Sequence, residues 1–263
     1  MSIYSSLAEN LQYFAPNFYK DRFFKKLKNL SKSNVLSRKV EPEFLWIQSF
    51  LKQDDVFVDV GANVGAYLYV LEPKLQPKNI LAFEPNQGLQ KRLRRIFPKI
   101  SVFPEALSNE QCIAEFKVPV IDGKKIHSRG TLQVQNKEEQ EEKSILQKVD
   151  VIPMDLHPTI QKLSRLNFIK IDVEGNEFLT VEGGKNTILK HKPTLMIEIE
   201  QRHHQEPIWN FIEKVKNWGY SANYLDRSTL EITELSQELI ENQDAANVKQ
   251  HEHYINNIIF IPI

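Results

Sequence analysis

The chain has 263 residues, 41% of them hydrophobic, and its 34 basic residues balance its 34 acidic residues. This length allows one large domain with a sizeable core, and the neutral balance argues against nucleic acid or an anionic membrane as the main partner. A single cysteine, Cys112, cannot form an internal disulfide, which is typical of the reducing cytoplasm. Because no run of 18 apolar residues occurs, no membrane-spanning helix is expected.

Residues 1–50 carry apolar side chains at helical spacing, with turns near Pro16 and Ser31, and predict an N-terminal helical annex. Residues 17–40 hold eight basic side chains and one acidic side chain, with aromatic residues between them. This composition is compatible with an amphipathic helix on a membrane surface. We favour packing of the aromatic residues on the rest of the protein, because stable membrane association normally needs more than one such signal.

From residue 51 to residue 263, short apolar runs alternate with helical segments and predict one α/β domain on a largely parallel sheet. Residues 108–150 break this pattern: 113–118 alternate like a strand, Asp122-Gly123 signals a turn, and the segment predicts a surface insertion or flap. We expect seven sheet strands, at 56–60, 79–84, 100–105, 168–172, 194–198, 221–225 and 257–261, and helices at 64–71, 86–97, 177–189 and 207–218.

The segment Asp59-Val60-Gly61-Ala62-Asn63-Val64-Gly65 joins the first expected strand to its helix, where doubly wound sheets bind nucleotides. Gly61 and Gly65 allow a sharp turn and a close approach to a ligand, and Asn63 tolerates the left-handed conformation. Asn63 also stands where the dinucleotide fingerprint needs its middle glycine. The turn therefore favours a nucleotide-like ligand without a pyrophosphate.

Glu84 ends the second expected strand, about twenty residues after the glycine turn. An acid at this spacing binds the ribose hydroxyls in nucleotide-binding units. Taken alone, the glycine turn could be an ordinary loop and Glu84 a solvated helix cap. Because the two occur together and in register, we favour a ligand site.

A group of acidic and histidine side chains follows two later strands, at the strand ends where open α/β sheets place their sites. Acids in a first helical turn also cap helices and interact with the helix dipole, which accounts for Glu177 better than for Asp172. The group consists of Asp172, Glu174 and Glu177 after one strand, and of Glu198, Glu200, His203 and His204 at the end of the next.

The segments D-V-G-A-N-V-G, F-E-P, I-K-I-D-V-E-G-N-E and P-T-L-M-I-E-I-E together resemble the FkbM-type methyltransferases. The resemblance runs over about residues 41–261 and includes Glu105-Ala106-Leu107-Ser108 and the closing strand Asn257-Ile258-Ile259-Phe260. It implies the class I methyltransferase (Rossmann-like) fold, a doubly wound, seven-stranded, mostly parallel sheet whose last strand is antiparallel. It also implies S-adenosylmethionine as methyl donor and O-methylation of a hydroxyl on a sugar, glycan or natural product.

The resemblance also implies roles for individual residues in binding the cofactor. The methionine end would be lined by Asp59, Gly61, Asn63 and Gly65, the ribose would be held by Glu84, and adenine would be flanked by Ala106 and Leu107.

Methyl transfer requires an acceptor oxygen aligned with the methyl carbon, and a base helps because a sugar hydroxyl is a weak nucleophile. Asp172, Glu198 and His203 are the candidates. His203 has the more suitable ordinary pKa, whereas a carboxylate needs burial or acidic neighbours. We expect His203 or Asp172 to be the base.

A divalent cation on Asp172 with Glu198 or Glu200 is the rival arrangement. We favour a site without a metal, because acids at strand ends are also common in metal-free sites. On the acceptor side the candidates are Glu174 and Glu200, and Arg129 and Thr131 in the irregular segment. Arg129 could contact an anionic acceptor group or be an ordinary solvated arginine.

Two other functions are compatible with the fold: a nicotinamide-dependent oxidoreductase and a non-catalytic cofactor-binding module. The missing middle glycine disfavours the first, and the acids at the strand ends disfavour the second. We expect a small-molecule or glycan acceptor and a cytoplasmic protein. A nucleic-acid partner is not expected, because the core domain lacks an aromatic and basic stripe. His127 has no partner at a recognisable spacing, so a surface or core role is expected for it.

Overall fold

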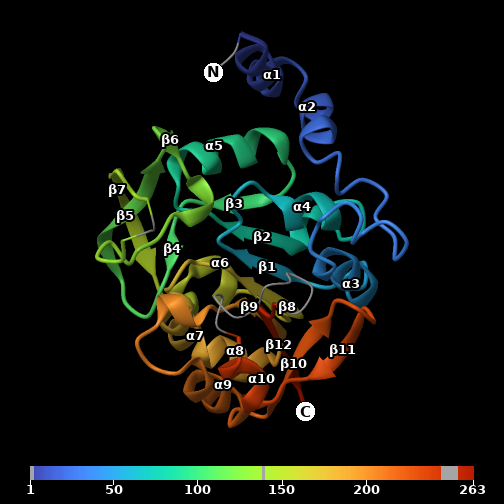
Figure 1. Cartoon of the computed structure of the whole chain (residues 1–263), viewed down its shortest axis with the longest axis vertical. Helices are drawn as coiled ribbons and strands as arrows, with labels where there is room; N and C mark the ends of the chain where they lie inside the picture. Colours follow the sequence, from blue (N-terminus) through green and yellow to red (C-terminus); the bar gives the residue numbers. More distant parts are fainter. Residues whose placement is uncertain (1–2, 138–139, 244–253) are drawn as a thin grey trace.

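The computed structural model of the chain describes residues 3–137, 140–243 and 254–263. These residues form a central eight-stranded sheet with the order β11-β10-β12-β9-β8-β1-β2-β3 (Figure 1). Its strands are β1 (Phe57–Val60), β2 (Ile80–Phe83), β3 (Ser101–Phe103), β8 (Phe168–Ile171), β9 (Thr194–Glu198), β10 (Tyr220–Asp226), β11 (Glu231–Glu234) and β12 (Asn257–Pro262).

The strands β3, β2, β1, β8 and β9 are parallel, and β12 lies antiparallel between β9 and β10. The prediction that the last strand is antiparallel is therefore confirmed. The predicted count of seven is wrong for the described residues, because β11 pairs antiparallel with β10 as an eighth strand. Its sequence Glu-Ile-Thr-Glu contains one apolar residue and lies mostly exposed, so its hydrophobic pattern is too weak to predict a strand.

Helices cover both faces of the central sheet, as a doubly wound fold requires. Successive side chains of a strand point to opposite faces, so Phe57 belongs to one hydrophobic core and Val58 to the other. On the Phe57 face lie α3 (Glu43–Phe50), α4 (Ala66–Leu71) and α5 (Gln87–Ile96). On the Val58 face lie α6 (Pro158–Gln161), α7 (Glu177–Gly183), α8 (Lys185–His191), α9 (Ile208–Lys216) and α10 (Gln237–Glu241).

The single helix predicted over 177–189 is two helices, because the chain breaks at Gly183 and Gly184. A Cβ on Gly183 would lie 1.9 Å from the carbonyl oxygen of Ser108. Only glycine allows this close backbone approach, which brings α7 against the chain that follows β4 (Ala106–Leu107).

The segment predicted as a flap forms a second sheet, here called the flap sheet, at one side of the central sheet (Figure 1). Its order is β4-β7-β5-β6, with β5 (Cys112–Ile121), β6 (Lys124–Lys125) and β7 (Lys143–Ile152). Asp122 and Gly123 both have positive φ, +49° and +68°, as the tight turn of a hairpin requires. The strand β7 was not predicted. Its first half is largely exposed and polar and therefore carries little hydrophobic periodicity.

The annex begins with α1 (Ile3–Phe14) and α2 (Pro16–Phe23), and its aromatic side chains divide into two groups. Tyr19 and Phe24 are buried, as expected from packing on the domain. Phe14 and Phe18 are 87% and 61% exposed, so the expectation of packing is wrong for Phe18. No helix among the described residues is long and apolar enough to cross a membrane.

Candidate active site

The turn between β1 and α4 is fixed by close backbone contacts. Gly61 has φ +83°, and a Cβ there would lie 1.8 Å from the carbonyl oxygen of Asp172. The N–H groups of Gly61 and Ala62 both donate to the carbonyl oxygen of Phe83, at 3.0 Å. Asn63 follows with a left-handed φ of +49°. The turn therefore holds the carboxyl ends of β1, β2 and β8 together.

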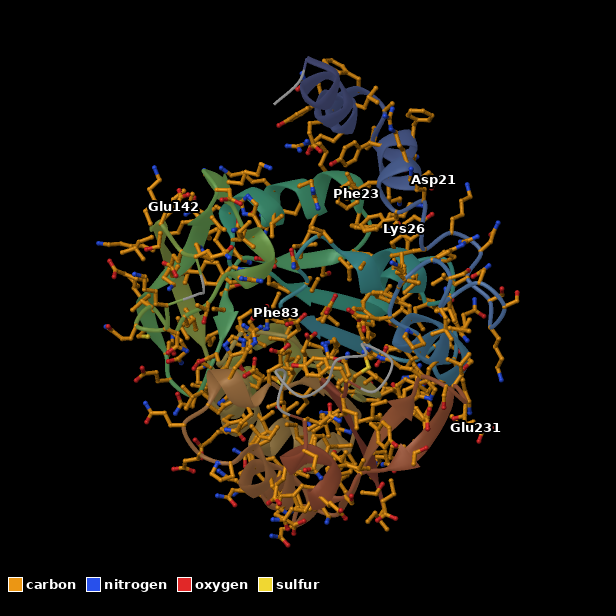
Figure 2. All side chains as sticks on the ribbon, viewed as in Figure 1. Asp21, Phe23, Lys26, Phe83, Glu142 and Glu231 are labelled. Atoms are coloured by element: carbon orange, nitrogen blue, oxygen red, sulfur yellow. The ribbon has the colours of Figure 1, made fainter. Side chains whose placement is uncertain are left out.

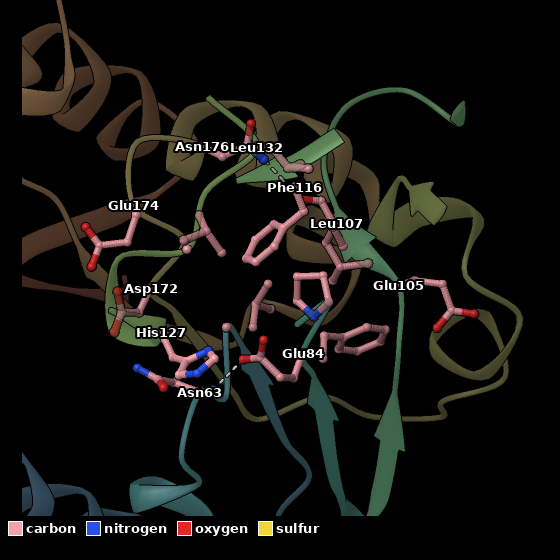
Figure 3. A pocket seen from close by; sticks show the side chains of 17 residues that line it. Asn63, Glu84, Glu105, Leu107, Phe116, His127, Leu132, Asp172, Glu174 and Asn176 are labelled. Atoms are coloured by element: carbon pink, nitrogen blue, oxygen red, sulfur yellow. Dashed lines mark hydrogen bonds between the residues drawn. The ribbon is translucent and has the colours of Figure 1, made fainter. Parts of the chain in front are cut away.

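Glu84 is buried at the end of β2, and each of its carboxyl oxygens accepts one backbone N–H; Figure 3 shows the hydrogen bond from Asn63. Oε2 accepts from Asn63 at 2.6 Å and Oε1 from Asn86 at 2.8 Å. Burial raises the pKa of Glu84 to about 7, although these two hydrogen bonds oppose the shift. A carboxylate oxygen accepts more than one hydrogen bond, so both oxygens keep the capacity to bind ligand hydroxyls.

A first cavity opens beside Glu84 (Figure 3). Ala106 and Leu107 line it, together with Phe116, Leu132 and His127 from the flap segment. His127 therefore lines a cavity instead of having only a surface or core role, and its Nδ1 lies 3.0 Å from the side-chain nitrogen of Asn86. Apolar and aromatic walls with a carboxylate at one end suit a nucleoside.

A second cavity shares Gly61, Asn63 and Asp172 with the first. Asp59 on β1 and Lys170 on β8 are partners in register, so both face the α3 and α4 side of the sheet. Oδ2 of Asp59 is buried without a hydrogen-bond partner, and burial raises the pKa of Asp59 to about 7 although Lys170 opposes the shift. A buried, unpartnered carboxyl oxygen beside a cavity fits a ligand that brings a donor or a cation.

A third, small cavity is lined almost entirely by acidic side chains. Asp172 lines all three cavities and therefore lies at their junction. Burial, and then the neighbouring charge of Glu198, raise the pKa of Asp172 well above its ordinary value. The lining residues are Asp172, Glu174, Glu177, Glu198, Glu200 and His203.

The two histidines of the candidate group have different surroundings. Nε2 of His203 lies 3.3 Å from Oε2 of Glu174. Burial, the largest single effect, disfavours the imidazolium, but the contact with Glu174 and the charges of Glu174 and Glu177 together raise the pKa of His203. Nε2 of His204 lies 3.0 Å from Glu177, and its ring stacks on Phe178 with centroids 3.9 Å apart. His203 lines the third cavity, whereas His204 packs against Phe178 and Glu177.

Three predicted site residues, Gly65, Arg129 and Thr131, line none of these three cavities. A Cβ on Gly65 would lie 2.7 Å from the side chains of Leu93 and Phe97, so this glycine allows α4 and α5 to pack closely. The Thr131 hydroxyl donates to the carbonyl oxygen of Glu174 at 2.7 Å and joins the flap segment to the loop after β8. Within the described ranges, no three His, Cys, Asp or Glu side chains are grouped so as to hold a metal ion.

Three polar residues of the second cavity were not predicted from the sequence: Glu41, Tyr67 and Lys170. For Lys170 a signal exists, because a lone lysine inside an otherwise apolar central strand is rarely buried without acidic partners. Its Nζ lies 3.7 Å from Oε2 of Glu198 and donates to the carbonyl oxygen of Ile171 at 3.2 Å. Glu41 belongs to no motif, and only the packing of α3 brings it to the cavity.

The acidic groups of this region predict how stability depends on pH. Burial is the main cause that raises the pKa of Glu41, Asp59 and Glu84 to about 7. Unfolded carboxyls titrate near pH ~4, so between about pH 4 and about pH 7 the unliganded folded protein binds more protons than the unfolded chain. Stability therefore falls as pH rises through this window.

We expect the midpoint of thermal unfolding without ligand to be lower at about pH 8 than at about pH 5.5. Each kcal/mol lost lowers the midpoint of a chain of this size by roughly 2–4 °C, so scanning fluorimetry resolves the effect. A midpoint that rises over the same interval would contradict the buried, protonated state of these carboxyls.

The sheet order, the glycine turn and the adjoining cavities are those of the class I methyltransferase fold, whose cofactor is S-adenosylmethionine. The first cavity fits the nucleoside of this cofactor, and the unpartnered Oδ2 of Asp59 beside the second cavity fits its cationic amino-acid moiety.

The family model described as "Methyltransferase FkbM domain" matches residues 59–224, more than half of the chain. The chain belongs to the FkbM methyltransferase family. This match decides against the nicotinamide-dependent oxidoreductase. None of the curated proteins compared with the sequence matches it.

Solved structures with a similar fold have low sequence identity. The FkbM methyltransferase from Methylobacillus flagellatus is 15% identical, with TM-score 0.49, over 80% of this chain and 44% of that one. The chain therefore spans less than half the length of that protein. A TehB-like SAM-dependent methyltransferase from Corynebacterium glutamicum is 9% identical, with TM-score 0.46, over 93% and 98% of the two chains. A putative RNA methyltransferase from Pyrococcus horikoshii is 10% identical, with TM-score 0.35, over 84% and 82%.

Proposed function

We propose that the protein methylates a hydroxyl group of a sugar, glycan or hydroxylated natural product in the cytoplasm. The observation that carries this proposal is the position of Asp172 at the junction of the three cavities. The first cavity suits a nucleoside, and the second suits a charged amino-acid group. The third cavity supplies carboxyl groups and an imidazole next to Asp172, where the three cavities meet. The free Cys112 is compatible with the reducing cytoplasm.

S-adenosylmethionine supplies a methyl group bound to a positively charged sulfur. Toward this cofactor, Glu84 accepts hydrogen bonds from the ribose hydroxyls, and Ala106 and Leu107 pack beside adenine. The backbone at Gly61 and Asn63 lies between the nucleoside and the amino-acid group. These contacts orient the methyl group toward Asp172, so that positioning supplies most of the rate enhancement.

Asp172 is the proposed base that accepts the proton of the acceptor hydroxyl. Burial and the neighbouring charge of Glu198 raise the pKa of Asp172, which makes its carboxylate a stronger base than that of an ordinary aspartate, and a cation bound nearby favours this carboxylate form. His203 is less suitable, because it lines only the third cavity, whereas Asp172 lines all three. We therefore choose Asp172 and assign His203 to contact with the acceptor.

The lining of the third cavity supports the proposed acceptor class. Glu174, Glu198 and Glu200 present carboxyl oxygens, which accept hydrogen bonds from sugar hydroxyls. The same lining repels phosphate groups, so we propose that nucleic acid is not the acceptor. Thr131 supports the site from the flap segment through its hydrogen bond to the carbonyl oxygen of Glu174.

The proposed function is tested by incubating the purified protein with S-adenosylmethionine and panels of monosaccharides, glycans, hydroxylated natural products and RNA. Mass spectrometry then locates any added methyl group. Methylation of a hydroxyl in one of the first three panels supports the proposal. Methylation of RNA alone, or methylation on nitrogen, refutes it.

A further inference from the structure

The second cavity contains a carboxyl group from outside the matched family domain. Glu41 precedes α3, whereas the family match begins at residue 59. It lines the cavity together with Asp59 and Asp172. Its Oε2 accepts a hydrogen bond from the Tyr67 hydroxyl at 3.2 Å, and Ile47 in α3 is fully buried against the sheet. The segment that carries Glu41 is therefore fixed in place.

The charges around this cavity are unbalanced. Lys170 is the only basic residue among those that line it, against the carboxyl groups of Glu41, Asp59 and Asp172. Burial, and then the charges of Glu198 and Glu43, raise the pKa of Glu41 to about 7. A buried carboxyl without a full partner destabilises the unliganded fold. A ligand with a cationic group would satisfy Glu41 and the unpartnered Oδ2 of Asp59 together.

We propose that Glu41, together with Asp59, binds the ammonium group of the amino-acid moiety of S-adenosylmethionine. This assignment rests on the proposed function. A ligand whose nucleoside occupies the first cavity extends into the second past Gly61, Asn63 and Asp172, which both cavities share. Lys170 on the same wall then faces the carboxylate of that moiety. Residues 41–50 thus become part of the cofactor-binding unit.

Calorimetric titration with two nucleosides tests the assignment. S-adenosylhomocysteine carries the amino-acid moiety, and 5′-methylthioadenosine lacks it. For the wild type we expect both to bind, the first more tightly. In Glu41→Gln the affinity for S-adenosylhomocysteine should fall about tenfold to hundredfold, as loss of a charge-assisted hydrogen bond predicts. The affinity for methylthioadenosine should change less than about twofold, because that ligand has no partner for Glu41.

Glu43→Gln is the matched control, because Glu43 lies two residues further along the same segment, is more buried than Glu41 and does not line the cavity, and its Oε1 lies 3.6 Å from Arg227. It should bind both ligands nearly as the wild type does. Equal losses for both ligands in Glu41→Gln, or an unchanged affinity for S-adenosylhomocysteine, overturn the assignment while the proposed function stands. A wild type that binds neither ligand contradicts the proposed function itself.

A different observation concerns the far end of the molecule. Residues 1–40 hold eight basic and two acidic residues, although the whole chain has no net charge. Figures 1 and 2 show α1 and α2 projecting at one end, with Phe23 and Lys26 in this region. We call residues 13–39 the N-terminal arm; its exposed side chains include Tyr13, Phe14, Phe18, Phe23, Arg22, Lys25, Lys26, Lys28, Lys32 and Lys39.

We infer that the N-terminal arm docks on an anionic lipid surface. Stable docking needs an apolar signal in addition to a basic one, and the exposed rings of Phe14 and Phe18 provide it. Aromatic rings partition into the membrane interface, and lysine and arginine side chains pair with anionic headgroups. Asp21 is the only acidic residue of the N-terminal arm, and its Oδ2 pairs with Nζ of Lys28 at 3.1 Å.

Flotation with phosphatidylglycerol or phosphatidylcholine vesicles tests this inference. We expect the wild type to float with the anionic vesicles only, and less at high salt. The double variant Phe14→Ser/Phe18→Ser should lose about tenfold or more of this binding. Ile113→Ser is the control, because Ile113 is 72% exposed on β5, outside the arm.

No flotation of the wild type with phosphatidylglycerol, or undiminished flotation of the double variant, overturns the inference. Sedimentation analysis tests a second copy of the chain as the occupant. A wild-type dimer that becomes a monomer in the double variant overturns the lipid assignment.

Discussion

Glu84→Gln is expected to weaken the binding of S-adenosylmethionine by about tenfold to hundredfold. The carboxylate accepts backbone N–H groups from Asn63 and Asn86. A glutamine would turn its amide donor toward one of these N–H groups, which costs stability in the free and the bound protein alike. The ribose hydroxyls would lose a charged acceptor, at a cost to binding of about 1.5–3 kcal/mol. Titration calorimetry measures the loss.

Glu115→Gln is a suitable control for this substitution, because Glu115 is exposed on β5. The thermal midpoint of each variant shows whether the protein remains folded. A folded Glu84→Gln protein that binds the cofactor within about threefold of the wild type, a difference of less than 1 kcal/mol, would contradict the assignment of Glu84 to the ribose.

Asp172→Asn is expected to lower turnover by about a hundredfold to ten-thousandfold, the range that a general base contributes. Cofactor binding should change less than turnover, because asparagine has nearly the same shape as aspartate and Glu84 and Asp59 remain to hold the cofactor. His203→Gln should lower turnover less than Asp172→Asn does, because Glu174 already stabilises the charged form of the His203 ring. Initial rates on an acceptor found in the screen, with cofactor affinity measured in parallel, separate the two residues.

The dependence of turnover on pH gives an independent test of the same base. In the wild type, kcat should rise with pH and reach a plateau as Asp172 loses its proton in the complex. The rise should disappear in Asp172→Asn and remain in His203→Gln. The opposite pattern would make His203 the base.

The parts of the site that sequence could predict are those that local motifs determine. The turn at Gly61 and the carboxyl group of Glu84 lie at the ends of neighbouring parallel strands, and strand order alone brings them together. Asp172 follows the next strand in the same sheet. Its predicted place among the acids of the neighbouring strand end agrees with the lining of the third cavity.

The parts that sequence could not predict depend on packing between distant segments. Glu41 reaches the second cavity only because α3 packs on the sheet. His127 and Phe116 reach the first cavity through the flap sheet, whose strand β7 has a largely exposed and polar first half. The edge strand β11 is equally polar. Such segments carry little hydrophobic periodicity, which is the main signal for secondary structure in a sequence.

The most direct test of a methyltransferase centred on Glu84 and Asp172 is calorimetric titration of the purified wild-type protein with S-adenosylmethionine and, separately, with NADH. We expect saturable binding of S-adenosylmethionine and no binding of NADH. Binding of NADH, or no binding of S-adenosylmethionine by the folded protein, would contradict it.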